Sequence, residues 1–155
     1  ALLCFIHGFR TNEICRLQIS DVDINSKSIY INRLKKGFST THPLLNEEIQ
    51  ALNDWLVIRK NYKNAESKWL FLSQKGNVLS RQQFYNIISK SGCRAGLPLV
   101  IHPHMLRHSC GFSLANKGID TRLIQDYLGH RNIRHTVWYT ASNSGRFHGI
   151  WNRKL

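Results

Sequence analysis

One segment of the sequence combines a side chain that can hold a phosphate with one that can move a proton. Residues 103–108 read PHMLRH, in which His104 and Arg107 stand three positions apart. On a helix such a pair shares one face, so both side chains would point to the same spot. The planar guanidinium of Arg107 can bind two phosphate oxygens, and the imidazole of His104 can exchange a proton beside it. The alternative is a surface His-x-x-Arg pair with no role.

A tyrosine near the end of the sequence is a candidate nucleophile. Tyr139 stands nine residues after His130, which follows the helix-ending Gly129. A phenol attacks only when neighbouring groups activate it. Taken alone, Tyr139 is more typical of a half-buried core residue, so its assignment depends on the side chains that surround it.

Two further cationic positions lie in the first quarter of the chain. Arg10 directly precedes a predicted helix that begins near Thr11, and the N–H groups at a helix N-terminus favour anions. Glu13 is close enough in sequence to orient an arginine or a histidine. The tip of a predicted hairpin, residues 35–37, reads KKG. Solvated surface charges are the alternative in both places.

These candidates need a scaffold, and the hydrophobic pattern predicts a mainly helical fold with a small antiparallel sheet. The apolar run 1–7 stops near Gly8, and Thr11 is a plausible N-cap for a second short helix. Two β-branched, alternating runs around a glycine turn indicate a hairpin. Capping residues and apolar residues spaced by three to four indicate the other helices. The expected elements are helices at 1–7, from 11, from 46, after Ser80, at 104–116, from Asp120 to Gly129 and at 133–139, strands at 28–34 and 38–44, and a short buried strand at 69–72.

The composition restricts the class of protein. The chain carries 22 Lys and Arg against 9 Asp and Glu, a net charge of +13, which favours nucleic acid as a partner. A generally basic surface is the alternative. No apolar run approaches the roughly 20 residues that span a bilayer, so no membrane partner is expected. The four cysteines form no CxxC pair and no signal peptide is visible, so reduced thiols in a cytoplasmic protein are expected.

The sequence predicts a single domain over residues 1–155. A chain of this length can bury a substantial core, and it contains no Pro-rich or long polar linker. It begins without Met, inside an apolar helix, so we expect that some N-terminal residues are missing.

Taken together, these segments resemble the tyrosine recombinase (phage integrase) family. The family pattern is an Arg that opens a helix, a Lys on a β-hairpin, a His-x-x-Arg helix, a Gly-His turn, and a Tyr nine residues after that His. In this sequence the pattern falls in the same order over nearly the whole chain, at Arg10, Lys36, His104, Arg107, His130 and Tyr139. Segments 35–44 and 122–137 are similar to the fimbrial phase-variation recombinases of enteric bacteria. Like those members, the chain shows no separate N-terminal core-binding domain.

The resemblance implies a tyrosine recombinase catalytic-domain fold and a DNA inversion that needs no metal, ATP or other cofactor. Tyr139 would attack the scissile phosphodiester and form a covalent 3′-phosphotyrosine. The two arginines and His130 would bind the phosphate, Lys36 would protonate the departing 5′-oxygen, and His104 would assist proton removal from the phenol. Inversion of a promoter-bearing element would make the enzyme a regulator of transcription.

The implied partners are double-stranded DNA with inverted-repeat recombination sites, further copies of the chain in a synaptic homotetramer, and accessory DNA-bending proteins, all in the bacterial nucleoid. From the basic surplus we expect DNA contacts at Arg33, Lys35, Ser80, Arg81, Gln82, Arg131 and Arg134. The apolar tail 147–151 would dock either on a neighbouring subunit or on its own core. We also expect Tyr139 to be displaced before DNA binds, because a short helix near the chain end is weakly held.

Other classes of function remain open at this point. A metal-dependent nuclease would need clustered carboxylates, and Asp21 and Asp23 have no third acidic partner in the sequence pattern. A weak zinc candidate is formed by His102, His104, His108 and Cys110. The two alternatives to a recombinase are a non-catalytic DNA-binding transcriptional regulator and a type IB topoisomerase-like enzyme.

Overall fold

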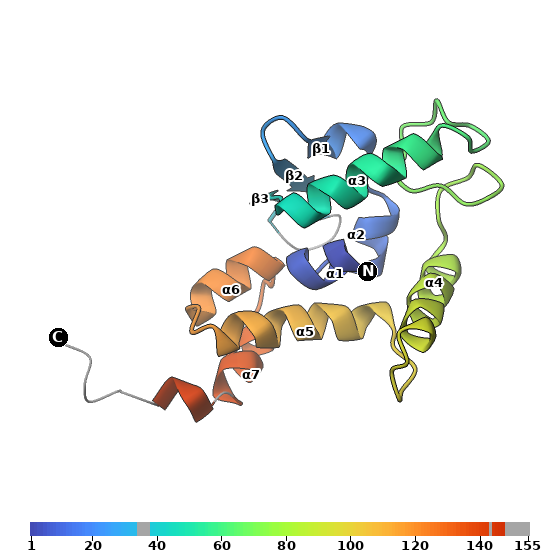
Figure 1. The fold of residues 1–155 in the computed structure, drawn as a ribbon. Coiled ribbons are helices and arrows are strands. Elements are labelled where there is room, and N and C mark those ends of the chain that lie inside the picture. The colour runs from blue at the N-terminus through green and yellow to red at the C-terminus, as the bar shows by residue number, and fades with distance from the viewer. Residues whose placement is uncertain (34–37, 143, 148–155) are drawn as a thin grey trace.

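The computed structural model describes residues 1–33, 38–142 and 144–147, and it confirms a mainly helical fold with a small antiparallel sheet (Figure 1). The helices are α1 (Leu2–His7), α2 (Thr11–Cys15), α3 (Asn46–Arg59), α4 (Arg81–Arg94), α5 (Pro103–Asn116), α6 (Thr121–Leu128) and α7 (Arg134–Ala141), with 3₁₀ turns η1 (Ile19–Asp21) and η2 (Ser144–Phe147). Strands β1 (Val22–Asp23), β2 (Ser28–Ile31) and β3 (Thr40–Pro43) form one sheet in that order. In Figure 1, α5 runs below α1, with α4 at one end and α6 and α7 at the other. No helix among the described residues is long and apolar enough to cross a bilayer.

The predicted hairpin forms from β2 and β3. The two strands pair antiparallel, with Ile29 opposite His42. Alternation along β2 sends Ile29 and Ile31 into the core. The tip of the hairpin, residues 34–37, lies outside the described residues, and so do the predicted site residues Lys35 and Lys36.

Two glycines end helices just before predicted site residues. Gly8 follows α1 and Gly129 follows α6, both in the left-handed conformation, with φ of 61° and 65°. A side chain at Gly8 would collide with the side chain of Leu128, and a Cβ at Gly129 would lie 2.8 Å from Nε of Arg33. Both turns therefore require glycine, for backbone conformation and for space.

The helix starts follow the predicted capping residues in two of three cases. The Ser80 hydroxyl accepts from the N–H of Gln83 at 3.1 Å, and the Asp120 carboxylate accepts two backbone N–H groups of α6. The second helix differs by one residue, because α2 begins at Thr11 and Arg10 occupies the N-cap position. The backbone N–H of Arg10 donates to the carboxylate of Glu13 in the first turn of α2, and Thr11 does not act as the cap.

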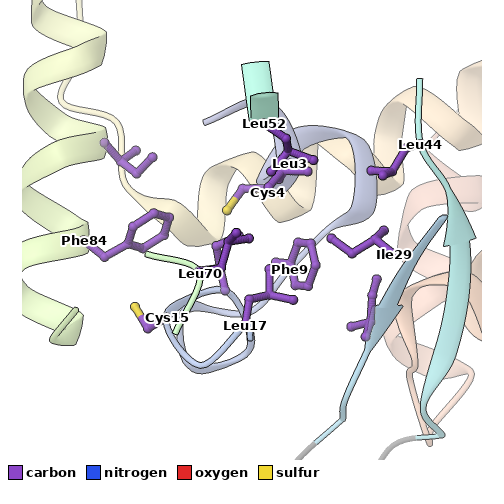
Figure 2. Close-up of a cluster of buried hydrophobic side chains, with 13 residues drawn as sticks. Leu3, Cys4, Phe9, Cys15, Leu17, Ile29, Leu44, Leu52, Leu70 and Phe84 are labelled. Atoms are coloured by element: carbon purple, nitrogen blue, oxygen red, sulfur yellow. The ribbon is translucent and has the colours of Figure 1, made fainter. Parts of the chain in front are cut away.

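The larger part of the core lies between α1, α2, the sheet, α3 and α4 (Figure 2). Leu3, Phe9, Ile29, Leu52 and Phe84 meet there from five different elements or turns. A second, smaller cluster lies between α5, α6 and α7 and includes Tyr139. The candidate nucleophile is therefore packed in a minor core next to the main one.

The predicted strand at 69–72 is wrong. The segment makes only isolated bridges, Trp69 to Gln18 and Leu72 to Val78. The reason is the buried side chain of Arg59, which donates to backbone carbonyls between residues 65 and 70 at 2.6–3.1 Å. A guanidinium has five N–H donors, so it satisfies these carbonyls in place of a partner strand.

Candidate active site

Arg107 on α5 is a buried cation that joins three elements. Its guanidinium donates to the carbonyl of Gly8 at the end of α1, and to the carbonyl of Leu128 at the end of α6, the latter at 2.7 Å. Only 2% of the residue is exposed. Burial, together with the charge of Arg10, lowers the pKa of Arg107 to about 10, so it stays protonated at neutral pH. The predicted phosphate-binding arginine therefore has a fixed position.

Glu13 is a buried carboxylate held between two arginines. Its Oε1 accepts from the side chain of Arg10 at 2.9 Å, and its Oε2 accepts from the side chain of Arg33 at 2.6 Å. Oε2 also accepts from the backbone N–H of Arg10 at 2.8 Å, which secures the start of α2. The prediction that Glu13 orients an arginine is confirmed. The Arg10 side chain is 40% exposed, so it remains accessible to an anion.

Arg33 does not lie on the surface, and this corrects the expectation that it contacts DNA phosphates. Its side chain is 0% exposed, and besides its ion pair with Glu13 it donates to the carbonyl of Tyr127 at 2.9 Å. The alternation of β2 continues beyond the end of the strand, so Arg33 points inward like Ile29 and Ile31. Arg33 therefore connects the hairpin to α2 and α6.

His130 follows the turn at Gly129 and is kept neutral by its surroundings. Its Nδ1 lies 2.9 Å from the hydroxyl of Thr136, which is fully buried on α7. Burial, together with the charges of Arg107 and Arg10, lowers the pKa of His130 to about 3. Both arginines predicted to bind the phosphate are therefore close enough for their charges to act on His130.

Tyr139 lies close to His130 and Arg107, and only 4% of the residue is exposed. Its ring faces that of His130, with centroids 6.3 Å apart, and its hydroxyl lies 3.0 Å from Nδ1 of His108. Burial raises the pKa of Tyr139, and the charge of Arg107 lowers it. The ring packs over Gly111, where a Cβ would come within 2.7 Å of its Cζ. We expected Tyr139 to be displaced from the site without DNA. In this structure its ring instead lies beside His130, because Gly111 leaves room for it.

His104 lies one turn before His108 on the same face of α5. The two rings meet edge to face, with centroids 4.4 Å apart. Burial lowers the pKa of His104, and so do the nearby His108 and Arg107, so His104 shares the positive field of the site. Among the interactions of the described residues, however, the hydrogen bond to Tyr139 comes from His108.

The other predicted DNA-contact residues within the described part of the chain are exposed, namely Ser80, Arg81, Gln82, Arg131 and Arg134. Arg81 and Gln82 line one surface hollow together with His104, and Arg131 lines another together with His130. Each hollow therefore joins a predicted catalytic histidine to predicted DNA contacts.

Within the described residues, no three His, Cys, Asp or Glu side chains gather as a metal site. The zinc candidate at residues 102–110 therefore finds no support. The His108 ring lies against His104 and Tyr139, and the thiol of Cys110 instead donates to the carbonyl of Ile6.

Three features of the site were not predicted. The contact from His108 to Tyr139 could have been anticipated, because His108 lies one helical turn from His104. Thr136 precedes Tyr139 by three residues on one helix, which is also a detectable signal. The third feature, a buried contact between Nδ1 of His7 and Nδ1 of His42 at 3.1 Å, joins α1 to β3 and has no local signal.

Comparison with known proteins gives consistent results. Residues 1–146 match the phage integrase family. The type 1 fimbriae regulatory protein FimB of Escherichia coli K12 is 78% identical over 152 residues, which cover 98% of this chain and 76% of that protein.

Solved structures extend this likeness to the fold. XerA recombinase superposes with a TM-score of 0.82 at 28% identity, over 99% of this chain and 56% of that chain. XerH recombinase bound to a palindromic difH substrate superposes with a TM-score of 0.79 at 29% identity, over 97% of this chain and 44% of that chain. The present chain thus spans about half the length of these two recombinases. The fold, the order of the motifs and these matches show that the chain belongs to the phage integrase family of tyrosine recombinases.

Proposed function

We propose that this chain catalyses site-specific inversion of DNA through a covalent 3′-phosphotyrosine at Tyr139, and thereby controls fimbrial phase variation. The observation that carries the proposal is the position of Arg107, whose guanidinium binds the carbonyls of Gly8 and Leu128. These carbonyls stand two residues before Arg10 and His130, and the ring of His130 stacks with that of Tyr139. Membership of the phage integrase family and the likeness to the fimbriae regulatory protein FimB support it.

The proposed reaction exchanges one phosphodiester for another. Oη of Tyr139 bonds to the phosphorus, the P–O5′ bond breaks, and the 5′-oxygen leaves as a hydroxyl after taking a proton from Lys36. A phenol with an ordinary pKa of about 10 is protonated at neutral pH, so attack needs a base and nearby cations. One ester bond replaces another, so the step requires no ATP.

The phosphate would be held by three donors of different character. Arg107 is immobilised by two carbonyls, Arg10 is accessible, and His130 is neutral. Because Nδ1 of His130 engages Thr136, Nε2 is the nitrogen left to donate to a phosphate oxygen. Loss of one such donor typically reduces the rate by about 10²–10³-fold.

DNA binding is proposed for the exposed residues that flank the site, with Lys35 as a further phosphate contact. We also propose that the chain acts as a single catalytic domain, in a homotetramer on two inverted repeats with accessory DNA-bending proteins, in the nucleoid. In that assembly the tail 147–151 would dock on a neighbouring subunit. From residue 148 onward this tail lies outside the described residues.

The proposal is tested with a nicked duplex that carries a candidate inverted repeat and traps the cleaved strand. The wild-type chain should form a protein–DNA adduct that survives denaturant, and Tyr139→Phe should abolish it. Tyr30→Phe is the matched control, because Tyr30 is 43% exposed on β2, and its adduct should equal that of the wild type.

The remaining functions are distinguished on a supercoiled plasmid that carries two inverted repeats. Inversion of the intervening segment supports the recombinase. Relaxation without inversion would favour a topoisomerase-like enzyme. DNA binding without any adduct on cognate DNA would favour a non-catalytic regulator and refute the proposal.

A further inference from the structure

His108 is the side chain in hydrogen-bond distance of the proposed nucleophile. Its Nδ1 lies 3.0 Å from Oη of Tyr139, within the range that a proton transfer requires. The two rings also meet at 64°, with centroids 6.0 Å apart. Both partners are anchored, since His108 lies in the middle of α5 and the ring of Tyr139 rests on Gly111 of the same helix.

The other candidate bases within the described part of the site have different partners. His130 directs Nδ1 to Thr136, and the carboxylate of Glu13 is bound by two arginines. His104 stands behind His108, with the two rings edge to face. A proton that leaves Tyr139 therefore meets His108 first.

The environment of His108 suits a proton acceptor. Burial lowers the pKa of His108, and the charges of Arg107 and His102 lower it further, so the ring is neutral at neutral pH. With its proton on Nε2, a neutral imidazole presents a lone pair on Nδ1. The residue as a whole is exposed, so water can stabilise the positive charge that the ring gains with a proton from Tyr139.

We propose that His108, and not His104, is the general base that activates Tyr139; this inference rests on the proposed cleavage reaction. The Oη–H bond breaks as Oη bonds to phosphorus, and the proton moves to Nδ1 of His108. The P–O5′ bond breaks, and the 5′-oxygen takes a proton from the general acid. In rejoining, a DNA 5′-hydroxyl gives its proton back to the general acid and bonds to phosphorus. The bond from phosphorus to Oη of Tyr139 breaks, and His108 returns its proton to Oη, so no proton is gained or lost overall.

The test compares single-turnover adduct formation by the wild type and His108→Asn on the nicked duplex. An Asn carbonyl near the position of Nδ1 can still accept the phenol's hydrogen bond, but it is not basic. Cleavage by His108→Asn should be slower by about 10²–10⁴-fold at pH 7, the usual contribution of a general base. Tyr30→Phe is again the control, because Tyr30 is 43% exposed on β2 and its replacement should leave the rate unchanged.

A pH series separates a base from a structural residue. Phenolate forms without help as the pH rises toward about 10, so the deficit of His108→Asn should shrink about tenfold per pH unit between pH 7 and 9. DNA affinity and thermal unfolding should match those of the wild type. If His108→Asn does not fold, His108→Gln carries the same expectation.

Three results would overturn the inference: a rate within threefold of the wild type at every pH, a deficit that does not change with pH, or faster cleavage. Each of these requires that the wild type forms an adduct. Absence of the wild-type adduct would instead refute the proposed function, so the two failures are distinguishable.

Discussion

Replacement of Glu13 by Gln should destabilise the fold strongly, because this one carboxylate neutralises two arginines next to a third. The amide of Glu13→Gln keeps the size of the side chain and can still accept the backbone N–H of Arg10. It removes the negative charge that faces Arg10 and Arg33, while Arg107 adds its own positive charge nearby.

The size of the effect follows from the burial of each pair. In the pair with Arg33 the two side chains are 0% and 5% exposed, and loss of one partner from a buried pair costs about 3–5 kcal/mol. The pair with Arg10 is half open to water, so it adds only about 0–1 kcal/mol. Together the two pairs amount to about 3–6 kcal/mol. For a domain of this length each kcal/mol lowers Tm by roughly 2–4 °C, so Glu13→Gln should lower Tm by roughly 6–24 °C.

Urea unfolding and calorimetry measure this change, with Asp126→Asn as control. Asp126 forms an exposed pair with Arg122 at 3.9 Å, so its loss should change the free energy of unfolding by less than about 1 kcal/mol. Duplex DNA should raise the Tm of Glu13→Gln more than that of the wild type, because phosphate replaces the missing anion. A Glu13→Gln protein within 1 kcal/mol of the wild type would show that the arginines do not depend on this carboxylate.

Three further outcomes are expected. Gly111→Ala should slow adduct formation by about tenfold or more, although alanine favours a helix, because its Cβ displaces the ring of Tyr139; an unchanged rate would contradict this. Thr136→Val should also slow adduct formation while DNA affinity in gel shifts stays the same, because it removes the partner of Nδ1 of His130; wild-type cleavage would exclude the positioning role. The free energy of unfolding, measured in urea, should fall as the pH is lowered from 6.5 toward 3. The folded protein holds His42 with a pKa of about 3, so the unfolded chain binds an extra proton there in this range, and His42 contributes a slope of at most about 1.4 kcal/mol per pH unit. His130, also with a pKa of about 3, adds a slope of the same size, so His42→Asn should reduce the dependence without abolishing it; a flat profile that His42→Asn leaves unchanged would contradict this.

Local sequence signals predicted most of the secondary structure. The caps at Ser80 and Asp120 and the turns at Gly8 and Gly129 form as expected, because each depends on hydrogen bonds or backbone angles within a few residues. The prediction of a strand at 69–72 failed because the carbonyls of Trp69 and Leu70 accept from the side chain of Arg59, ten and eleven residues away in sequence. A hydrogen bond from a side chain so far away in sequence leaves no local sequence pattern.

The sequence by itself determined the order of the candidate residues and the helices and turns that carry them, because periodicity and capping act over a few positions. Only the tertiary structure decided which of them meet. It buried Arg33 against Glu13 and turned His108 toward Tyr139, since these contacts depend on how the hairpin and α7 pack on α2 and α5. Burial and the summed field of the arginines then keep His130 neutral, a property that arises from charges brought together by folding.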